Sequence, residues 1–299
     1  MSRKFATLLS LLVCAFFGLA GQAFAQKKLR VGVTLHPYYS FVANIVGDRM
    51  EIVPVIPGEV NPHGYEPGPD DIKRASTLDA LVVNGIGHDE FIFKIVEAAG
   101  RKDNLPMIYA NASVALIPIG GERNGEKIVN PHTFVSTNGA IQQVYEIARR
   151  LGEIDPPNAT FYRNNGRDYG TRIRRLRADF MQRIASHGKD FRAATMHAGY
   201  DYLFQEFGLR VAAVIEPRHG VSPTARQLAQ TLEDIRAAKV QVLFAEQYFG
   251  GNLAETVRRE TGVRVYTLAH ITDGPFTADK FEREMRENID TLARALEEQ

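Results

Sequence analysis

The feature that most constrains the fold is a regular alternation of short apolar runs with amphipathic ones, broken once by a long stretch without any strand signal. Apolar runs suited to strands occur at 29–35, 51–56, 80–85, 107–110, 193–196, 211–215, 240–245 and 263–268. Helical patterns lie between them, at 41–46, 70–77, 89–99, 140–151, 200–207, 224–238, 253–261 and 277–298. Strands that alternate with helices favour parallel sheets. The sequence therefore predicts an α/β fold.

The interruption covers residues 156–187 and predicts one long helix. Pro156-Pro157 suits a helix start. Apolar residues then recur on one helical face, at Phe161, Tyr169, Ile173, Leu176, Phe180 and Ile184. We therefore expect two Rossmann-like lobes, 26–155 and 188–299, each with a mostly parallel four-stranded sheet, joined by this rigid helix. Ligands of open α/β sheets bind outside the carboxyl ends of the strands, so a site is expected in the cleft between the lobes.

The first 25 residues have the pattern of a cleavable signal peptide. Arg3 and Lys4 precede an apolar run, and Ala23-Phe24-Ala25 supplies a small-x-small cleavage site. We expect cleavage after Ala25 and a free periplasmic protein. Cys14, the only cysteine, follows Leu-Leu-Val, which is a poor lipidation signal. The mature chain would then contain no cysteine and no disulfide.

The charge balance gives no reason to expect nucleic acid or an anionic membrane as partner, since 36 Lys and Arg face 35 Asp and Glu. The arginines concentrated in residues 163–183 are interpreted as a solvated helix face, because acidic residues elsewhere balance them.

Three histidines share a context at predicted strand ends or loops. His63 lies in the Pro- and Gly-rich loop 61–71, His132 follows Asn130-Pro131, and His197 ends the apolar run at 193–196. Neutral imidazole is a good ligand for Zn²⁺ and similar ions. The intervals between them match no local metal motif, so the residues alone leave two readings open: a three-histidine metal site, or separate structural histidines.

The remaining histidines receive structural interpretations. His36 and His219 are expected in solvent-exposed turns. His88, which precedes Asp89-Glu90, is interpreted as a helix start, and His187 as a helix end.

Several motifs resemble those of the zinc/manganese substrate-binding proteins of ABC importers, the cluster A-I or TroA/ZnuA-like family. They are Asn-Pro-His-Gly-Tyr-Glu-Pro at 61–67 with Asp70, Asn-Pro-His-Thr-Phe at 130–134, Thr-Met-His-Ala-Gly-Tyr at 195–200, Phe-Ala-Glu-Gln at 244–247, and Phe281 with 288–292. The resemblance covers the mature chain and implies two α/β lobes bridged by a long helix. It also implies that His63, His132 and His197 are metal ligands.

The fourth ligand of the family falls where this chain departs from the pattern. The family's aspartate aligns with Leu268, so Asp273 is the first candidate and His270 the alternative. Glu66 and Glu246 are expected to support ligand histidines rather than bind metal. Histidine at the third position favours Zn²⁺ over Mn²⁺.

The expected function is therefore high-affinity binding of Zn²⁺, or alternatively Mn²⁺, and delivery to an ABC permease and ATPase, by a monomer without enzymatic activity. A metallochaperone is considered as a further partner. The alternative is a zinc hydrolase with three histidines, a metal-bound water and Glu66 or Glu246 as base; an adhesin role is a third option.

Overall fold

The computed structural model of the chain describes residues 27–123, 125–185, 187, 190–216, 222–246 and 251–298. The predicted signal peptide, with Cys14 and the cleavage site after Ala25, lies outside these residues, and so does His219. Within the described part of the chain, no helix combines the length and the apolar character needed to cross a membrane.

The N-terminal lobe is built on a four-stranded parallel sheet. Its strands are β1 (Arg30–Val33), β2 (Glu51–Pro54), β3 (Ala80–Val83) and β4 (Met107–Tyr109), in the order β2-β1-β3-β4. Its helices are α2 (His36–Val46), α3 (Pro69–Ser76) and α4 (Phe91–Ala98), with a short 3₁₀ turn η1 (Pro62–Gly64). His36-Pro37 starts α2, five residues before the helical pattern predicted from residue 41, because proline suits the first helical turn.

The C-terminal lobe repeats this plan. Its strands are β7 (Arg192–Thr195), β8 (Arg210–Val214), β9 (Val242–Glu246) and β10 (Arg264–Leu268), all parallel, in the order β10-β9-β7-β8. Its smaller elements are η3 (Ala198–Tyr200), α7 (Asp201–Glu206), α8 (Ala225–Ala237) and α9 (Gly251–Thr261). The predicted α/β class with two four-stranded parallel sheets is confirmed.

One element was not predicted. Residues 111–139, for which the sequence predicted neither strand nor helix, contain a two-stranded antiparallel sheet, β5 (Pro118–Arg123) and β6 (Glu126–Val129). Asn124-Gly125 between these strands is a strong hairpin signal, because both residue types tolerate the positive φ that tight hairpin turns need.

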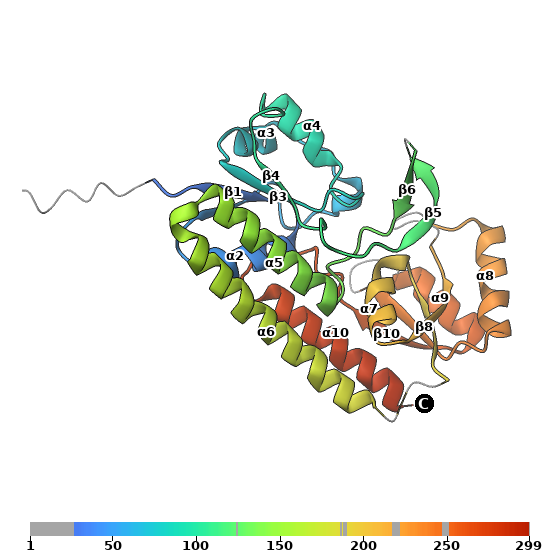
Figure 1. Ribbon diagram of the computed structural model, residues 1–299. Coiled ribbons are helices and arrows are strands. Elements are labelled where there is room, and N and C mark those ends of the chain that lie inside the picture. Colours follow the sequence, from blue (N-terminus) through green and yellow to red (C-terminus); the bar gives the residue numbers. More distant parts are fainter. Residues whose placement is uncertain are drawn as a thin grey trace, which may run out of the picture.

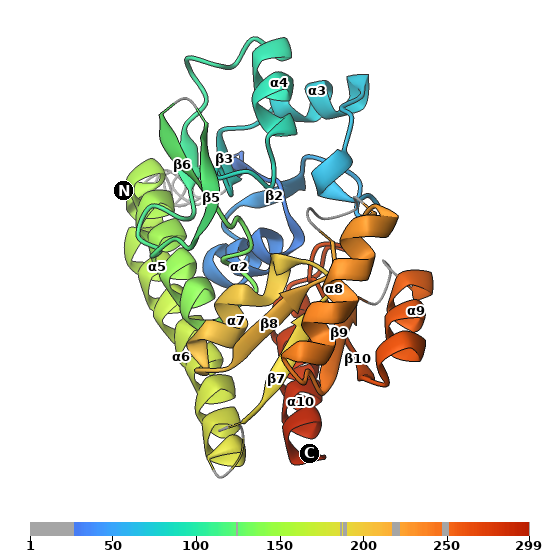
Figure 2. The ribbon, with the colours of Figure 1, turned by 90° about the vertical axis from the view of Figure 1, so that its right-hand side faces the viewer.

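Three long helices hold the lobes together. They are α5 (Thr137–Ile154), α6 (Ala159–Ile184), preceded by the turn η2 (Pro156–Asn158), and α10 (Lys280–Glu297). With 26 residues, α6 is about 39 Å long, and it runs along both lobes (Figure 1). Seen from the side, the two sheets stack one above the other beside it (Figure 2). The predicted long helix is confirmed.

Two glycines of α6 have a packing reason. A Cβ on Gly166 would lie 3.0 Å from the Cβ of Ala148, and one on Gly170 would lie 2.8 Å from the hydroxyl of Tyr145. Ala148 and Tyr145 belong to α5, so the glycines let the two helices approach closely. This contact compensates for the poor helix propensity of glycine.

The arginines of α6 are more than a solvated face. Arg172 pairs with Glu282 at 3.1 Å, and Arg183 pairs with Asp290 at 3.2 Å, both on α10. Arg177 pairs with the buried carboxylate of Glu206 on α7 at 2.9 Å. The side chains remain exposed, as a solvated face requires, but they also attach α6 to elements of the C-terminal lobe.

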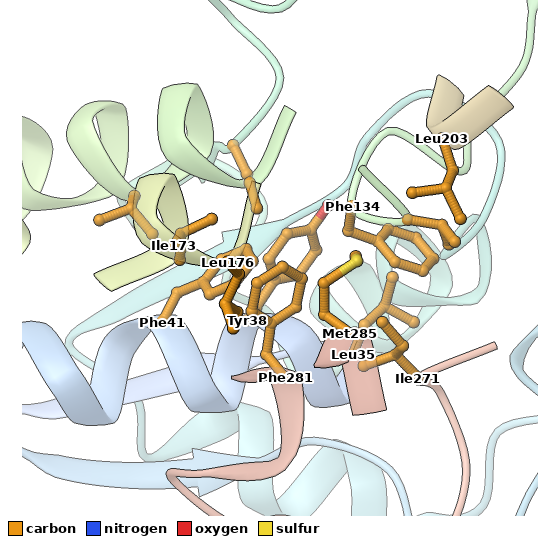
Figure 3. Packing of buried hydrophobic residues seen from close by; sticks show 14 of the residues in the cluster. Leu35, Tyr38, Phe41, Phe134, Ile173, Leu176, Leu203, Ile271, Phe281 and Met285 are labelled. Atoms are coloured by element: carbon orange, nitrogen blue, oxygen red, sulfur yellow. The ribbon is translucent and has the colours of Figure 1, made fainter. Parts of the chain in front are cut away.

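The lobes share one continuous hydrophobic core. Tyr38 and Phe41 of α2 lie in the same cluster as Ile173 of α6 and Phe281 of α10 (Figure 3). The rings of Phe41 and Phe281 are 4.9 Å apart. Because close-packed interiors resist deformation, this core and α6 together oppose large movements of one lobe against the other.

Candidate metal centre

Histidines from both lobes meet where the carboxyl ends of the two sheets face each other. His63 follows β2, His88 follows β3, His132 follows β6, and His270 follows β10. One ligand atom from each of these four lies within 4.8 Å of those from the other three. His88, His132 and His270 are buried, whereas His63 is partly exposed.

The spacing of the donor atoms suits a metal ion. His63 Nε2 and His132 Nε2 are 3.2 Å apart. Tetrahedral zinc has Zn–N bonds of about 2.0–2.1 Å, which puts its nitrogen ligands about 3.3 Å from each other. All four members of this group are histidines, and imidazole nitrogen is a donor that suits zinc, nickel, iron and copper.

His132 is oriented by Asn130. The side-chain oxygen of Asn130 accepts from the backbone N–H of His132 at 3.1 Å and from its Nδ1 at 2.7 Å. The amide of Asn130 donates to the carbonyl of Ala198 at 2.7 Å, which fixes its orientation. Since an amide oxygen only accepts, Nδ1 of His132 carries the proton and Nε2 presents its lone pair to the other histidines.

His132 is also kept neutral. Burial lowers its pKa well below the usual value, and the neighbouring histidines His270, His197, His88 and His63 lower it further. Metal ligation needs the unprotonated imidazole. The environment of His132 therefore favours the form that binds metal.

The loop that carries His88 is fixed by the buried carboxylate of the next residue, Asp89. Asp89 accepts from the Thr34 hydroxyl at 2.6 Å and from the backbone N–H groups of Asn84 and Gly85 at 2.7 and 2.9 Å. These bonds hold the loop between β3 and α4. Burial raises the pKa of Asp89. His88 thus lies on a firmly held loop, with its ring 4.0 Å from that of His63.

The loop that carries His63 is held by Asp71. Its carboxylate accepts from the Tyr65 hydroxyl at 2.6 Å and the Gly68 N–H at 2.7 Å, and it pairs with Arg74. Glu66, expected to support a ligand histidine, is exposed. Asp71 therefore holds this loop, and the supporting role expected for Glu66 stays a prediction.

His270 turns into the group directly after β10. Its Nδ1 lies 2.7 Å from the hydroxyl of Thr272. Its ring is 5.0 Å from that of His132 and 5.5 Å from that of His88. Phe134 packs against His270 at 5.9 Å and against His88 at 5.2 Å, so one wall of the group is apolar.

His197 lies beside the group but outside its four donors. Its ring is 5.0 Å from that of His132 and 5.2 Å from that of His270. Its Nδ1 pairs with the buried carboxylate of Glu246 at the end of β9. A carboxylate at Nδ1 is the arrangement that orients an imidazole for metal binding through Nε2, in line with the supporting role expected for Glu246.

Asp273 is partly buried and lies outside the group of donors found among the described residues. Burial raises its pKa, while Lys280 opposes the rise. The alternative fourth candidate, His270, is the one that the fold brings into the group.

Sequence reasoning missed His88 and misjudged His36. His88 follows β3 just as His197 follows β7, so the criterion that singled out His197 applied to His88 as well. The adjacent Asp89-Glu90 suggested a helix start instead, yet α4 begins at Phe91. His36, expected in an exposed turn, is only 1% exposed, because it starts a helix that packs between the lobes.

Comparisons with known proteins find relatives over nearly the whole chain. The chain is 27% identical over 307 residues to the metal ABC transporter substrate-binding lipoprotein FimA of Streptococcus parasanguinis, covering 98% of this chain and 99% of FimA. It is 26% identical over 309 residues to the manganese ABC transporter substrate-binding lipoprotein PsaA of Streptococcus pneumoniae, covering 98% and 99%.

Among solved structures, the SBP FpvC of Pseudomonas aeruginosa in complex with Ni²⁺ is 49% identical with a TM-score of 0.85, covering 91% of this chain and 98% of FpvC. The same protein in complex with Mn²⁺ gives 49% identity and a TM-score of 0.86, covering 91% and 99%.

FimA and PsaA are both substrate-binding components of metal ABC transporters. The profile of the family described as "Zinc-uptake complex component A periplasmic" matches residues 31–295. The chain belongs to this family of substrate-binding proteins.

Membership settles the general role. The protein is an extracytoplasmic binding protein rather than an enzyme, and its family serves importers that contain a permease and an ATPase. The hydrolase alternative finds no support in these relatives. A laminin-binding adhesin of Streptococcus agalactiae shares the fold, at 20% identity and a TM-score of 0.79.

Proposed function

We propose that the protein captures a divalent transition-metal ion with His63, His88, His132 and His270 and delivers it to an ABC permease for uptake. The observation that carries the proposal is the convergence of these four imidazole donors within 4.8 Å. His197, oriented by Glu246, is proposed as a fifth ligand for ions that take more than four. Between the two candidates from the sequence, His270 is preferred to Asp273, whose carboxylate is not part of the group.

The preferred metal is Zn²⁺ rather than Mn²⁺. Imidazole ligands suit zinc and nickel, whereas manganese favours carboxylate and water, and Mn²⁺ stands lowest in the general order of affinities. FpvC, at 49% identity, has been solved with Ni²⁺ and with Mn²⁺, so both ions belong in the test.

Entry and release follow from the burial of the ligands. His63 is the partly exposed member, and the other three are buried behind it. The metal therefore passes His63 on its way in and out. Because α6 and the shared core oppose large lobe movements, release depends on the loops that carry the ligands and on contact with the permease.

The test is a titration of the metal-stripped mature protein with Zn²⁺, Ni²⁺ and Mn²⁺ against a competing chelator. His132→Ala should weaken Zn²⁺ binding by more than about 100-fold. This exceeds the loss of about 10–100-fold that is typical when a residue that only hydrogen-bonds to a metal ligand is removed. Asp273→Ala should stay close to wild type, and so should the control His187→Ala at an exposed histidine. Wild-type affinity in His63→Ala and His132→Ala, or tighter binding of Mn²⁺ than of Zn²⁺, would contradict the proposal.

Three further expectations concern the protein in its compartment. We propose a monomer, checked by light scattering, and cleavage after Ala25, checked by the intact mass of the exported protein. A mass that includes a lipid on Cys14 would instead indicate a lipoprotein. Loading by a metallochaperone would be detected as faster metal acquisition from a protein donor than from a chelator of equal affinity.

A further inference from the structure

The segment at residues 269–279, here called the His270 loop, connects β10 to α10. Its first residue is tied to the C-terminal helix, because Asn288 of α10 accepts from the N–H of Ala269 at 2.7 Å and donates to its carbonyl at 2.8 Å. The rest of the loop is bound to α2, which belongs to the N-terminal lobe. His270 is therefore supplied by one lobe and held against the other.

His36, the first residue of α2, makes the central contacts. Its Nε2 lies 2.7 Å from the carbonyl oxygen of Gly274, and because a carbonyl only accepts, Nε2 carries the proton and donates. Its ring stacks on Phe276 with 3.9 Å between ring centroids and 3° between the planes. Burial lowers the pKa of His36 to about 4, so the imidazole is neutral at neutral pH.

Two more side chains of α2 continue the attachment. The Ser40 hydroxyl donates to the carbonyl of Thr277 at 2.8 Å, and the Asn44 amide donates to the carbonyl of Ala278 at 2.8 Å. On the other side, Gly58 lies so close that a Cβ there would be 2.4 Å from the Gly274 oxygen. The Gly274 carbonyl is thus enclosed between His36 and the segment that leads to His63.

The backbone next to His270 needs such support. Ile271 has φ = 69°, in the left-handed region that β-branched residues rarely adopt. Its side chain is fully buried in the shared core. A conformation of this kind persists only where the surroundings impose it, and the attachments on α2 begin three residues further along, at Gly274.

We propose that His36 is a positioning residue for metal binding: through Gly274 and Phe276 it fixes the His270 loop on α2 and so keeps His270 among the ligands. This inference rests on the proposed function. It makes the four-histidine group a preformed site whose members are all held by the N-terminal lobe, and it assigns to α2 the control of one ligand.

Variants of His36 separate its hydrogen bond from its ring. His36→Phe keeps an aromatic ring on Phe276 but removes the donor to Gly274, so Zn²⁺ affinity should fall about tenfold. His36→Gln places an amide N–H near the position of Nε2 and should restore most of the affinity. Asn165→Ala, which removes a bond to the α2 carbonyl of Ile45 without touching the loop, is the control and should bind like wild type.

The readout that a purely structural role would not change is the visible spectrum of bound Co²⁺, which reports ligand number and geometry. His36→Phe should give a spectrum shifted toward that of His270→Ala. The double variant His36→Phe/His270→Ala should bind no more than about twofold more weakly than His270→Ala, since the effect of His36 passes through His270.

The outcomes are distinguishable. If His270→Ala binds as wild type, the proposed ligand set fails and the inference fails with it. If His270→Ala is weakened but His36→Phe has wild-type affinity and spectrum, or the double variant shows additive losses, the inference alone is overturned. Should His36→Phe not fold by circular dichroism, Ser40→Ala removes one loop contact and should weaken Zn²⁺ about threefold, with unchanged affinity counting against the inference.

Discussion

Asn130 offers the sharpest separation of metal affinity from stability. Its side-chain oxygen orients His132 through two hydrogen bonds, while its amide donates to the Ala198 carbonyl and, at 3.1 Å, to the carboxylate of Asp201. Asn130→Ala removes both functions. Loss of the partner that orients a ligand histidine costs about 10–100-fold in metal affinity, or about 1.4–2.8 kcal/mol.

The same substitution should also destabilise the fold. It leaves the backbone N–H and Nδ1 of His132, the Ala198 carbonyl and the Asp201 carboxylate each without one partner. With about 1 kcal/mol for each lost bond, partly recovered by water, the free energy of unfolding should fall by about 2–4 kcal/mol. Urea unfolding of the metal-free protein measures the loss of stability. Chelator competition for Zn²⁺ on the folded protein measures the loss of metal affinity.

Asn130→Asp is the matched control. It keeps the oxygen that accepts from His132 but replaces the amide by a second carboxylate beside Asp201, whose pKa is already raised by burial. Zn²⁺ affinity should stay within about threefold of wild type, while stability falls at pH 7 and partly recovers at pH 5. Equal losses of affinity in both variants, or Asn130→Ala within twofold of wild type, would refute the orienting role.

The remaining predictions concern pH and packing. Burial lowers the pKa of His36 from 6.5 to about 4, so the stability that neutral His36 contributes is complete above pH 6.5 and is lost as pH falls through 4. The full pKa shift corresponds to about 3 kcal/mol of unfolding free energy. Urea unfolding curves of His36→Gln should lack this part of the pH dependence. Zn²⁺ affinity should weaken as pH falls toward 5, since protons compete for the ligand histidines; calorimetry at three pH values checks this, and a flat profile would contradict histidine ligation. Gly166→Leu should cost about 1–3 kcal/mol or more in thermal unfolding, because a Cβ there would lie 3.0 Å from the Cβ of Ala148, whereas Asn164→Leu on the exposed side should change little.

Much of the fold could be predicted because its signals are local. The apolar runs predicted as strands include β1, β3 and β9, which are fully or nearly fully buried, and the long periodic face of α6 predicted its helix. The hairpin of β5 and β6 was missed because β5 is glycine-rich and β6 is only four residues long, so neither shows the alternation that marks a half-buried strand.

The site was harder because its assembly depends on contacts across the chain. His63 and His132 were found through motifs that surround them. His88 has no such motif, and only the order of strands brings it next to His63. The choice between Asp273 and His270 depends on the path of the loop after Leu268, which is set by Asn288 and α2. These contacts join residues up to 238 positions apart.

The order of the ligands along the chain also governs when the site exists. His63 and His270 are separated by 207 positions (270 − 63), and the core that supports them joins α2 to α10, for example through Phe41 and Phe281. Neither half of the chain can assemble this site alone. Contacts between residues so far apart in the sequence slow folding. A chain that is exported N-terminus first can therefore bind metal with all four histidines only after residue 281 has left the cytoplasm.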